Sequence, residues 1–329
     1  MSNQELEQLE DQLRKSDEYR VIRKYQKPKG YNSGNDCNNS NDRSQNKLIG
    51  AFLDIEATGL LYTSDKLIEL GMVKFEYTED GRIFSLLEEF SGYQDPNVSI
   101  PGHITKLTGI SDDMVKGHSI DENAVSEYLK DVNIIIAHNA QFDRAFFETA
   151  FPNIPPRAWG CSMRDINWMD EDISSLKLEY IAYRYGFFFE GHRAIIDCLA
   201  GIHILAQDLM KSREPVLKRL LDNAMQLEFK LIARDSPYDS KDLLKTKGYK
   251  WGMPPINSYR AWYITAPENR VESEIKYLRS DIYESNTTLP VEIEISDAFN
   301  KHSIINRSVE STNKKYADKL IWAKELCKI

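Results

Sequence analysis

The stretch Ile49-Gly-Ala-Phe-Leu-Asp-Ile-Glu-Ala-Thr-Gly59 predicts a β-strand that ends in a pair of carboxylates. Because side chains alternate across a strand, Asp54 and Glu56 lie on the same face. Paired carboxylate oxygens are ligands that Mg²⁺ and Mn²⁺ prefer. In a chain with 28% charged residues, Asp-x-Glu also arises by chance. A solvated strand face is therefore the alternative for this motif alone.

The segments around this strand predict an α/β domain over residues 48–213. Residues 66–77 and 82–93 are further strand candidates, and the turn 79–81 between them makes an antiparallel meander. The apolar run 131–137 is typical of a strand buried on both faces, and a helix carrying Phe142, Phe146 and Phe147 follows it. Helices are expected at 176–185 and 194–210. Antiparallel strands followed by a β-α unit and packed helices indicate a mixed sheet flanked by helices.

A second cluster, His138-Asn-Ala-Gln-Phe-Asp143, lies where the buried strand turns into a helix. We expect Asn139 to be the N-cap, which places Asp143 in the first turn. The positive end of the helix dipole favours an ionised carboxylate there. An ordinary helix start with an acidic first turn explains the same residues.

A third cluster, His192-Arg-Ala-Ile-Ile-Asp197, opens the last helix of the domain. Five helical residues turn through about 140° beyond a full circle, which would point His192 and Asp197 apart. If Gly191 and His192 belong to the preceding loop, His192 can reach over a site that Asp197 lines. The alternative is a surface histidine near a helix start.

In this order, the three clusters resemble the DnaQ-like DEDDh 3′–5′ exonucleases, the superfamily that includes the proofreading epsilon subunit of bacterial DNA polymerase III. The segment Ile100-Pro-Gly-His-Ile-Thr-Lys-Leu-Thr-Gly-Ile-Ser-Asp112 and the strand Leu67-Ile-Glu-Leu-Gly-Met-Val73 are also similar to the family. The resemblance covers residues 48 to about 210. It implies a ribonuclease H-like exonuclease fold. Ala57 stands where the family often has Thr, so one hydroxyl contact to substrate is missing.

The resemblance also implies a two-metal hydrolysis of phosphodiester bonds. Asp54, Glu56, Asp143 and Asp197 would hold two Mg²⁺ ions, for which Mn²⁺ could substitute. His192 would take a proton from the attacking water, because its unperturbed pKa is near 6.5. The products would be nucleoside 5′-monophosphates. The residues expected to hold the terminal nucleotide are Thr58, Gly59, Asn139 and Phe142.

Outside this domain the sequence predicts three further parts. Residues 1–25 suggest a short exposed helix, and 26–47 a flexible polar linker, because so polar a segment cannot bury enough surface to offset the entropy of ordering. Residues 225–329 suggest a small α+β module with strands at 229–234, 249–251 and 260–265 and helices at 240–247 and 271–283. Its basic residues are interleaved with Tyr249, Trp251, Trp262 and Tyr263, which is typical of single-strand binding. Packing of the module's own core is the alternative role for these aromatics. The segment 226–229 faintly resembles a sliding-clamp-binding peptide, although the start of a strand is the other interpretation.

Composition limits the function less sharply than the motifs do. The net charge is −9, and residues 225–329 hold 17 basic and 15 acidic side chains, so the module is at +2 and the remainder at −11. Bound cations would reverse the field of an acidic site. The four cysteines form no Cys-x-x-Cys pair, which argues against disulfides and a thiolate zinc site. Without a long apolar run or a signal peptide, we expect a cytoplasmic protein with no membrane contact.

We therefore expect an enzyme on DNA 3′ ends, in replication proofreading or repair, whose partner is a nucleic acid with a free and single-stranded 3′ end. One alternative keeps the chemistry and changes the substrate to RNA ends or short oligoribonucleotides, because nothing in the sequence reads the 2′-hydroxyl. The other is a non-catalytic nucleic-acid-binding protein on an exonuclease fold. A polymerase or a sliding clamp would be an additional partner.

Overall fold

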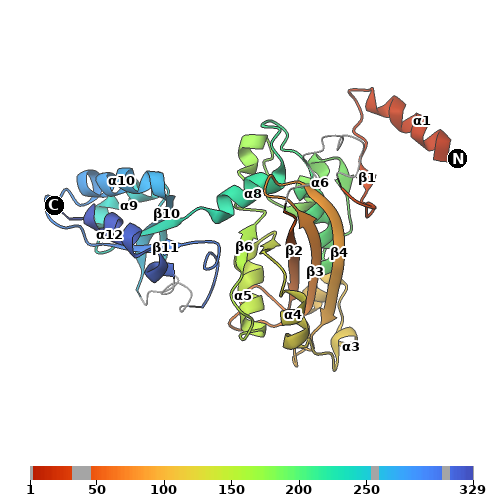
Figure 1. The fold of residues 1–329 in the computed structure, drawn as a ribbon, viewed down its shortest axis with the longest axis horizontal. Helices are drawn as coiled ribbons and strands as arrows, with labels where there is room; N and C mark the ends of the chain where they lie inside the picture. Colours follow the sequence, from red (N-terminus) through yellow and green to blue (C-terminus); the bar gives the residue numbers. More distant parts are fainter. Residues whose placement is uncertain (1–2, 32–45, 253–258, 306–311, 329) are drawn as a thin grey trace.

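A five-stranded mixed sheet forms the centre of the larger part of the molecule (Figure 1). The structure is a computed structural model that describes residues 3–31, 46–252, 259–305 and 312–328. The strand order is β4-β3-β2-β5-β6. The bounds are Leu48–Ala57 for β2, Leu67–Tyr77 for β3, Ile83–Tyr93 for β4, Ile134–Ala137 for β5 and Ala158–Cys161 for β6. The strands β2, β3 and β4 form the predicted antiparallel meander, while β5 and β6 run parallel to β2.

Helices cover both faces of this sheet, which places β2 in the middle of the core. On one face, Phe52 and Ile134 pack with α6 (Leu178–Arg184), α7 (Ala194–Leu205) and α8 (Val216–Met225). On the other, Leu53 and Ile135 pack with α4 (Glu122–Tyr128) and α5 (Ala140–Ala150). The short helices α2 (Gly102–Thr108) and α3 (Asp112–Val115) precede α4, and a 3₁₀ turn spans Trp168–Glu171. The predicted α/β class, a mixed sheet with an antiparallel meander flanked by helices, is confirmed.

The helix α7 lies unusually close to the sheet. A Cβ on Gly201 would lie 2.3 Å from the ring of Phe52, and one on Gly71 would lie 2.6 Å from the backbone of Ala194. Side chains interdigitate at close-packed density in protein cores, so these glycines set how closely the helix approaches β2 and β3. The spacing fixes the distance between the carboxylates of β2 and the first turns of α7.

The N-terminal region contains the predicted exposed helix, α1 (Asn3–Arg14), which projects from the body in Figure 1. Beyond it, β1 (Arg23–Lys24) pairs in parallel with β7 (Phe187–Phe188). The predicted flexible linker 26–47 is wrong at Tyr31, which is 8% exposed, packs in the main core and donates its backbone N–H to Phe84. The remaining linker prediction at 32–45 lies outside the described residues.

The hydrophobic core of the larger part, the cluster that holds Phe52, extends past the predicted domain boundary at residue 213. Val216, Leu217 and Leu220 of α8 are fully buried against the same cluster that holds Phe52. The prediction missed a usable signal, which was Pro215 before the helix followed by buried apolar residues at helical spacing, Leu217, Leu220, Leu221 and Ala224. In Figure 1, α8 lies between the larger part and the C-terminal module.

The C-terminal module has a sheet and a core of its own. Its four strands are ordered β11-β8-β10-β9 and are all antiparallel to their neighbours. Their bounds are Glu228–Ala233 (β8), Lys250–Gly252 (β9), Ala261–Pro267 (β10) and Val291–Ser296 (β11). The helices are α9 (Lys241–Lys247, after a 3₁₀ turn at Tyr238–Ser240), α10 (Glu268–Tyr277, extended by a π-helical turn at Leu278–Ile282) and α12 (Ala317–Glu325). The predicted strands at 249–251 and 260–265 correspond to β9 and β10, which pair with each other, whereas β11 and α12 were not predicted.

The chain returns from the module to the larger part after β11. Arg144 of α5 is 1% exposed and donates its guanidinium N–H groups to the carbonyls of Phe299 and Lys301. The backbone N–H of Trp159 in β6 donates to the carbonyl of Ala298 at 2.8 Å. Lys301 in turn donates to the carbonyls at the end of α8. The module is thus joined to the body through both α8 and this return segment, residues 297–305.

The segment 226–229 is the start of β8, as the strand interpretation expected. Phe229 is 0% exposed and packs in the core of the module, so this segment cannot bind a clamp as a free peptide. Among the described residues, Cys161, Cys198 and Cys327 are buried free thiols. The described part of the chain contains no helix with the length and apolar content of a membrane span.

Candidate active site

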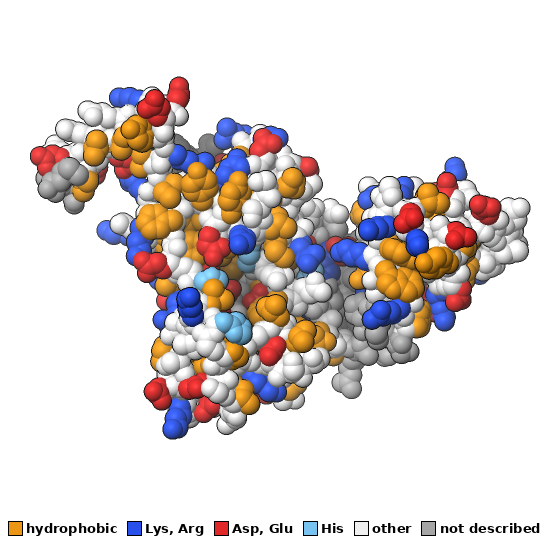
Figure 2. All heavy atoms as spheres, turned by 180° about the vertical axis from the view of Figure 1, so that it is seen from behind, with side chains coloured by type: hydrophobic (Ala, Val, Ile, Leu, Met, Phe, Trp, Pro, Cys, Tyr) orange, Lys and Arg blue, Asp and Glu red, His pale blue; other side chains and the backbone are white. Residues whose placement is uncertain are grey.

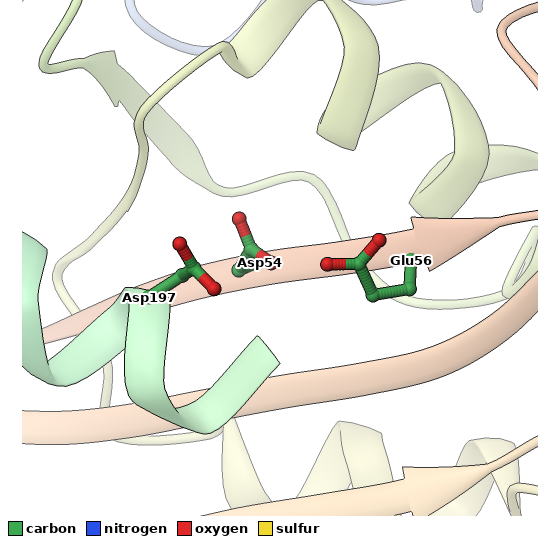
Figure 3. Close-up of side chains that lie close together, drawn as sticks. All are labelled: Asp54, Glu56 and Asp197. Carbon is green, nitrogen blue, oxygen red and sulfur yellow. The ribbon is translucent and has the colours of Figure 1, made fainter. Parts of the chain in front are cut away.

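Three carboxylates converge at the C-terminal half of β2 (Figure 3). One oxygen from each of Asp54, Glu56 and Asp197 lies within 4.8 Å of the others. Asp54 and Glu56 come from the same face of β2, as the alternation predicts, and Asp197 points toward them from the first turn of α7 (Figure 3). The structure therefore brings the first and third sequence clusters together.

Asp143 joins the same centre from α5. It lies in the first turn of that helix, as predicted, and is 3% exposed. Its Oδ1 accepts the backbone N–H of Ile55 at 3.2 Å, the residue between Asp54 and Glu56. Asp143 is therefore beside the cluster, although its oxygens are outside the 4.8 Å group.

The electrostatics of this centre favour a cation. Burial, followed by the charges of Asp197 and Asp143, raises the pKa of Asp54 well above its ordinary value. Burial and the same Asp197 charge raise the pKa of Glu56 to about 8. Burial also raises the pKa of Asp143 and of Asp197. Buried carboxylates that lie close together repel one another, so their charge is neutralised by bound protons or by a hard cation. The donor set thus fits a divalent metal ion.

A fifth acidic residue, Glu69 of β3, fixes the N-terminus of α7. Glu69 is 2% exposed, and its Oε2 accepts the backbone N–H of Ala194 at 3.1 Å. Its Oε1 accepts hydrogen bonds from the Nε and Nη2 of Arg193. The same Nη2 also donates to the hydroxyl oxygen of Tyr93. The backbone N–H of Arg193 donates to Asp197 Oδ2 at 3.1 Å. No role for Glu69 was predicted from the sequence, although it lies in the quoted strand 67–73, because its partners Arg193 and Ala194 are far along the chain.

His192 lies in the loop before α7, because the helix begins at Ala194. Its φ of 64° turns the chain so that the side chain does not follow the helical direction. The His192 side chain is 43% exposed, and its Nε2 lies 3.8 Å from Oε1 of Glu179. The charge of Glu179 also acts on Asp197. Glu179, at the start of α6, is a second acidic neighbour that the sequence did not identify.

The four residues predicted to hold the terminal nucleotide have mixed surroundings. Thr58 is 6% exposed and its Oγ1 accepts the N–H of Lys66 at 2.9 Å, which closes the loop after β2. A Cβ on Gly59 would lie 2.6 Å from the Asp65 carboxylate. Asn139 is the N-cap of α5, as predicted, but its side chain makes no capping bond.

Phe142 is the fourth of these residues. Its ring packs 4.7 Å from that of Phe146. Thr58 and Phe142 thus have structural contacts of their own. Asn139, beside Asp143 in the chain, keeps a side chain without a capping partner. Figure 2 shows this face of the body hollowed, with histidine and acidic side chains around the hollow.

Residues 51–205 match the family model described as "Exonuclease". The chain is 32% identical over 167 residues to a DNA polymerase III PolC-type of Clostridium perfringens, covering 49% of this chain and 11% of the relative. It is 28% identical over 207 residues to the PolC-type polymerase of Caldanaerobacter subterraneus, covering 59% of this chain and 14% of the relative. The chain therefore matches only about a tenth of the length of these relatives.

Among solved structures, exonuclease I matches with a TM-score of 0.44 and 14% identity. The match covers 85% of this chain and 72% of exonuclease I.

Proposed function

We propose that residues 51–205, which match the exonuclease family model, form a metal-dependent 3′–5′ exonuclease domain of the DnaQ-like superfamily that acts on DNA. The convergence of Asp54, Glu56 and Asp197 within 4.8 Å carries this proposal. The sequence relatives are PolC-type DNA polymerases, which favours DNA over RNA as the substrate. The same relatives favour a role beside a polymerase.

The four carboxylates would hold the metal ions, Mg²⁺ or Mn²⁺, with Asp54 central to the set. A bound pair of divalent cations supplies Lewis-acid stabilisation to the attacking and leaving oxygens of a phosphodiester. Asp143 contributes an oxygen from the α5 side and keeps β2 in place through the N–H of Ile55. Asp197 is held at its helix terminus by the N–H of Arg193.

His192 serves as the general base of the reaction. Its Nε2 accepts a proton from the attacking water as the new bond to phosphorus forms and the bond to the 3′ oxygen breaks. Glu179 stabilises the resulting imidazolium, since its carboxylate lies 3.8 Å from that nitrogen. The loop position of His192 leaves the ring free to approach substrate, and its 43% exposure leaves room for the water.

The test is hydrolysis of 5′-labelled oligomers by purified protein with Mg²⁺ or Mn²⁺. We expect a ladder that shortens by one nucleotide at a time and nucleoside 5′-monophosphates as products. Asp54→Asn and Asp143→Asn should each abolish the reaction, because each removes a metal ligand. Asp113→Asn, at an exposed position of α3, is the matched control and should keep full activity.

Matched single-stranded DNA, duplex DNA and RNA define the substrate. Faster hydrolysis of RNA than of DNA would overturn the assignment to DNA, and full activity in Asp54→Asn would refute the site itself.

A further inference from the structure

We propose that the β9–β10 edge of the C-terminal module is a binding surface for single-stranded nucleic acid, an inference that rests on the proposed exonuclease function. The surface consists of Trp251, Trp262 and Arg260, with Lys250 and Tyr263 on the opposite side of the same two strands. We call it the tryptophan edge. It would hold the strand whose 3′ end enters the active site.

The two tryptophans form an exposed aromatic pair. Trp251 and Trp262 are directly opposite each other in the β9–β10 pairing, and their ring centroids are 5.6 Å apart. Trp262 packs partly against the module core, whereas Trp251 on the edge strand remains 54% exposed. By contrast, Trp159 and Trp168 are at most 3% exposed. An exposed indole supported from behind by a second ring offers a base a flat surface on which to stack.

Two exposed basic residues, Lys250 and Arg260, lie near the tryptophans in the chain. Arg260 directly precedes β10, two residues before Trp262 in the chain. Lys250 is adjacent to Trp251 and pairs across the strands with Tyr263. Both are exposed, and neither takes part in an ion pair within the described ranges.

Some other basic residues of the module have carboxylate partners, among them Lys230, Arg234 and Lys319. Figure 2 shows hydrophobic side chains of the module gathered in one patch with basic side chains around it.

Charge and shape favour a nucleic acid over a peptide as the occupant. A peptide added to this edge would pair with a strand of only 3 residues, too short for a stable extra strand. A single strand of nucleic acid instead matches every feature, because its bases stack on indoles and its phosphates approach Arg and Lys. Base stacking and phosphate contacts do not distinguish the bases by their hydrogen-bonding edges, so we expect little sequence preference.

The experiment measures binding separately from hydrolysis. The Asp54→Asn protein, which cannot degrade the ligand, is titrated with a thymidine oligomer of roughly 20 nucleotides, a length that exceeds typical binding sites for single strands. Binding is followed by quenching of tryptophan fluorescence and by anisotropy of a labelled oligomer. Adding Trp251→Ala should weaken binding by roughly 5- to 100-fold, the range found for loss of one stacked base. Trp251→Phe should recover most of that loss.

Two further variants separate stacking from charge and from general loss of apolar surface. Lys250→Gln with Arg260→Gln should reduce the slope of log affinity against log salt by about 1.4 units, because two phosphate contacts of about 0.7 each are lost. Leu243→Ala, which truncates a 52% exposed apolar side chain without an aromatic ring, should bind like the parent.

In the active protein, Trp251→Ala should raise KM for the long strand and leave hydrolysis of a dinucleotide unchanged. Equal oligomer affinity in Trp251→Ala and its parent overturns the tryptophan edge and leaves the exonuclease assignment standing. Absence of hydrolysis in the unmodified protein refutes the exonuclease instead.

Discussion

The carboxylate of Glu69 connects the core of the sheet to the active site, so its replacement by glutamine should lower activity without touching a metal ligand. Glu69 is 2% exposed and accepts bonds from Ala194 N–H at 3.1 Å and from the Arg193 guanidinium. A glutamine keeps the shape of the side chain but has only one oxygen. In Glu69→Gln the NH₂ group must face one of these donors, which then has no acceptor.

The size of the effect follows from these contacts. A buried hydrogen bond to a charged acceptor contributes about 1.5–3 kcal/mol. The Arg193 side chain is 44% exposed, so solvent screening reduces the contribution of its ion pair with Glu69 to the free energy of unfolding. We expect the free energy of unfolding to fall by about 2 kcal/mol, which lowers Tm by about 3 °C in a protein of 329 residues. Asp197 is one turn from Ala194, and a misplacement of about 1 Å costs on the order of 10²-fold in rate.

The assay compares Glu69→Gln with Glu76→Gln, a second Glu→Gln change on β3 whose side chain is 26% exposed and bonds to Lys47 and Ser85. Both are measured well below their melting temperatures. We expect Glu69→Gln to lower kcat by roughly 10- to 100-fold and to weaken Mn²⁺ binding, while KM for DNA stays unchanged. A purely structural role would lower Tm alone. Wild-type kcat and Mn²⁺ affinity in folded Glu69→Gln would refute the reasoning.

Three other outcomes are expected. His192→Ala should lose a factor of about 10²–10⁴ in rate and keep its metal affinity; loss of Mn²⁺ binding in calorimetry would contradict a role as base. In the metal-free folded protein, the pKa of Glu56 is about 8, above its ordinary value. The free energy of unfolding should therefore fall as pH rises from about 5 to 8, because Glu56 loses its proton in the folded state. Mg²⁺ should accordingly raise Tm more at pH 8 than at pH 6. A pH-independent Mg²⁺ effect on Tm would contradict that coupling. Arg144→Met should lower Tm by leaving the carbonyls of Phe299 and Lys301 without donors; an unchanged Tm, or protection of the return segment equal to wild type in hydrogen exchange, would show that these bonds do not hold the module.

Local pattern was sufficient for the site's framework. Strand alternation put Asp54 and Glu56 on one face, and the helix start after β5 put Asp143 in a first turn. The loop position of His192 depended on where α7 begins, and the structure begins it at Ala194. These features are local, since each follows from a period or a cap within a few residues.

The features that could not be predicted from the sequence depend on contacts between distant residues or lack a local hydrophobic period. Glu69 and Glu179 reach the site only through the packing of β3 and α6, which no local pattern encodes. The strand β6 has 4 buried residues and therefore no alternation. The strand β11 does alternate, with Val291, Ile293 and Ile295 on its inner face, and that period was a usable signal. Tyr31 was misjudged because one aromatic anchor can hold a polar segment to a core.

The return segment makes the module a part that is fastened at both ends. A module joined only by α8 could rotate about one connection, but here rotation would have to break the bonds of Arg144 and Trp159 to residues 298–301. We therefore expect the distance between the tryptophan edge and the carboxylates to be constant. A strand long enough to span that length is held at both places, whereas a shorter one loses the outer contact in a single step. Degradation should accordingly slow abruptly at one residual length, and that length measures the distance between the two sites.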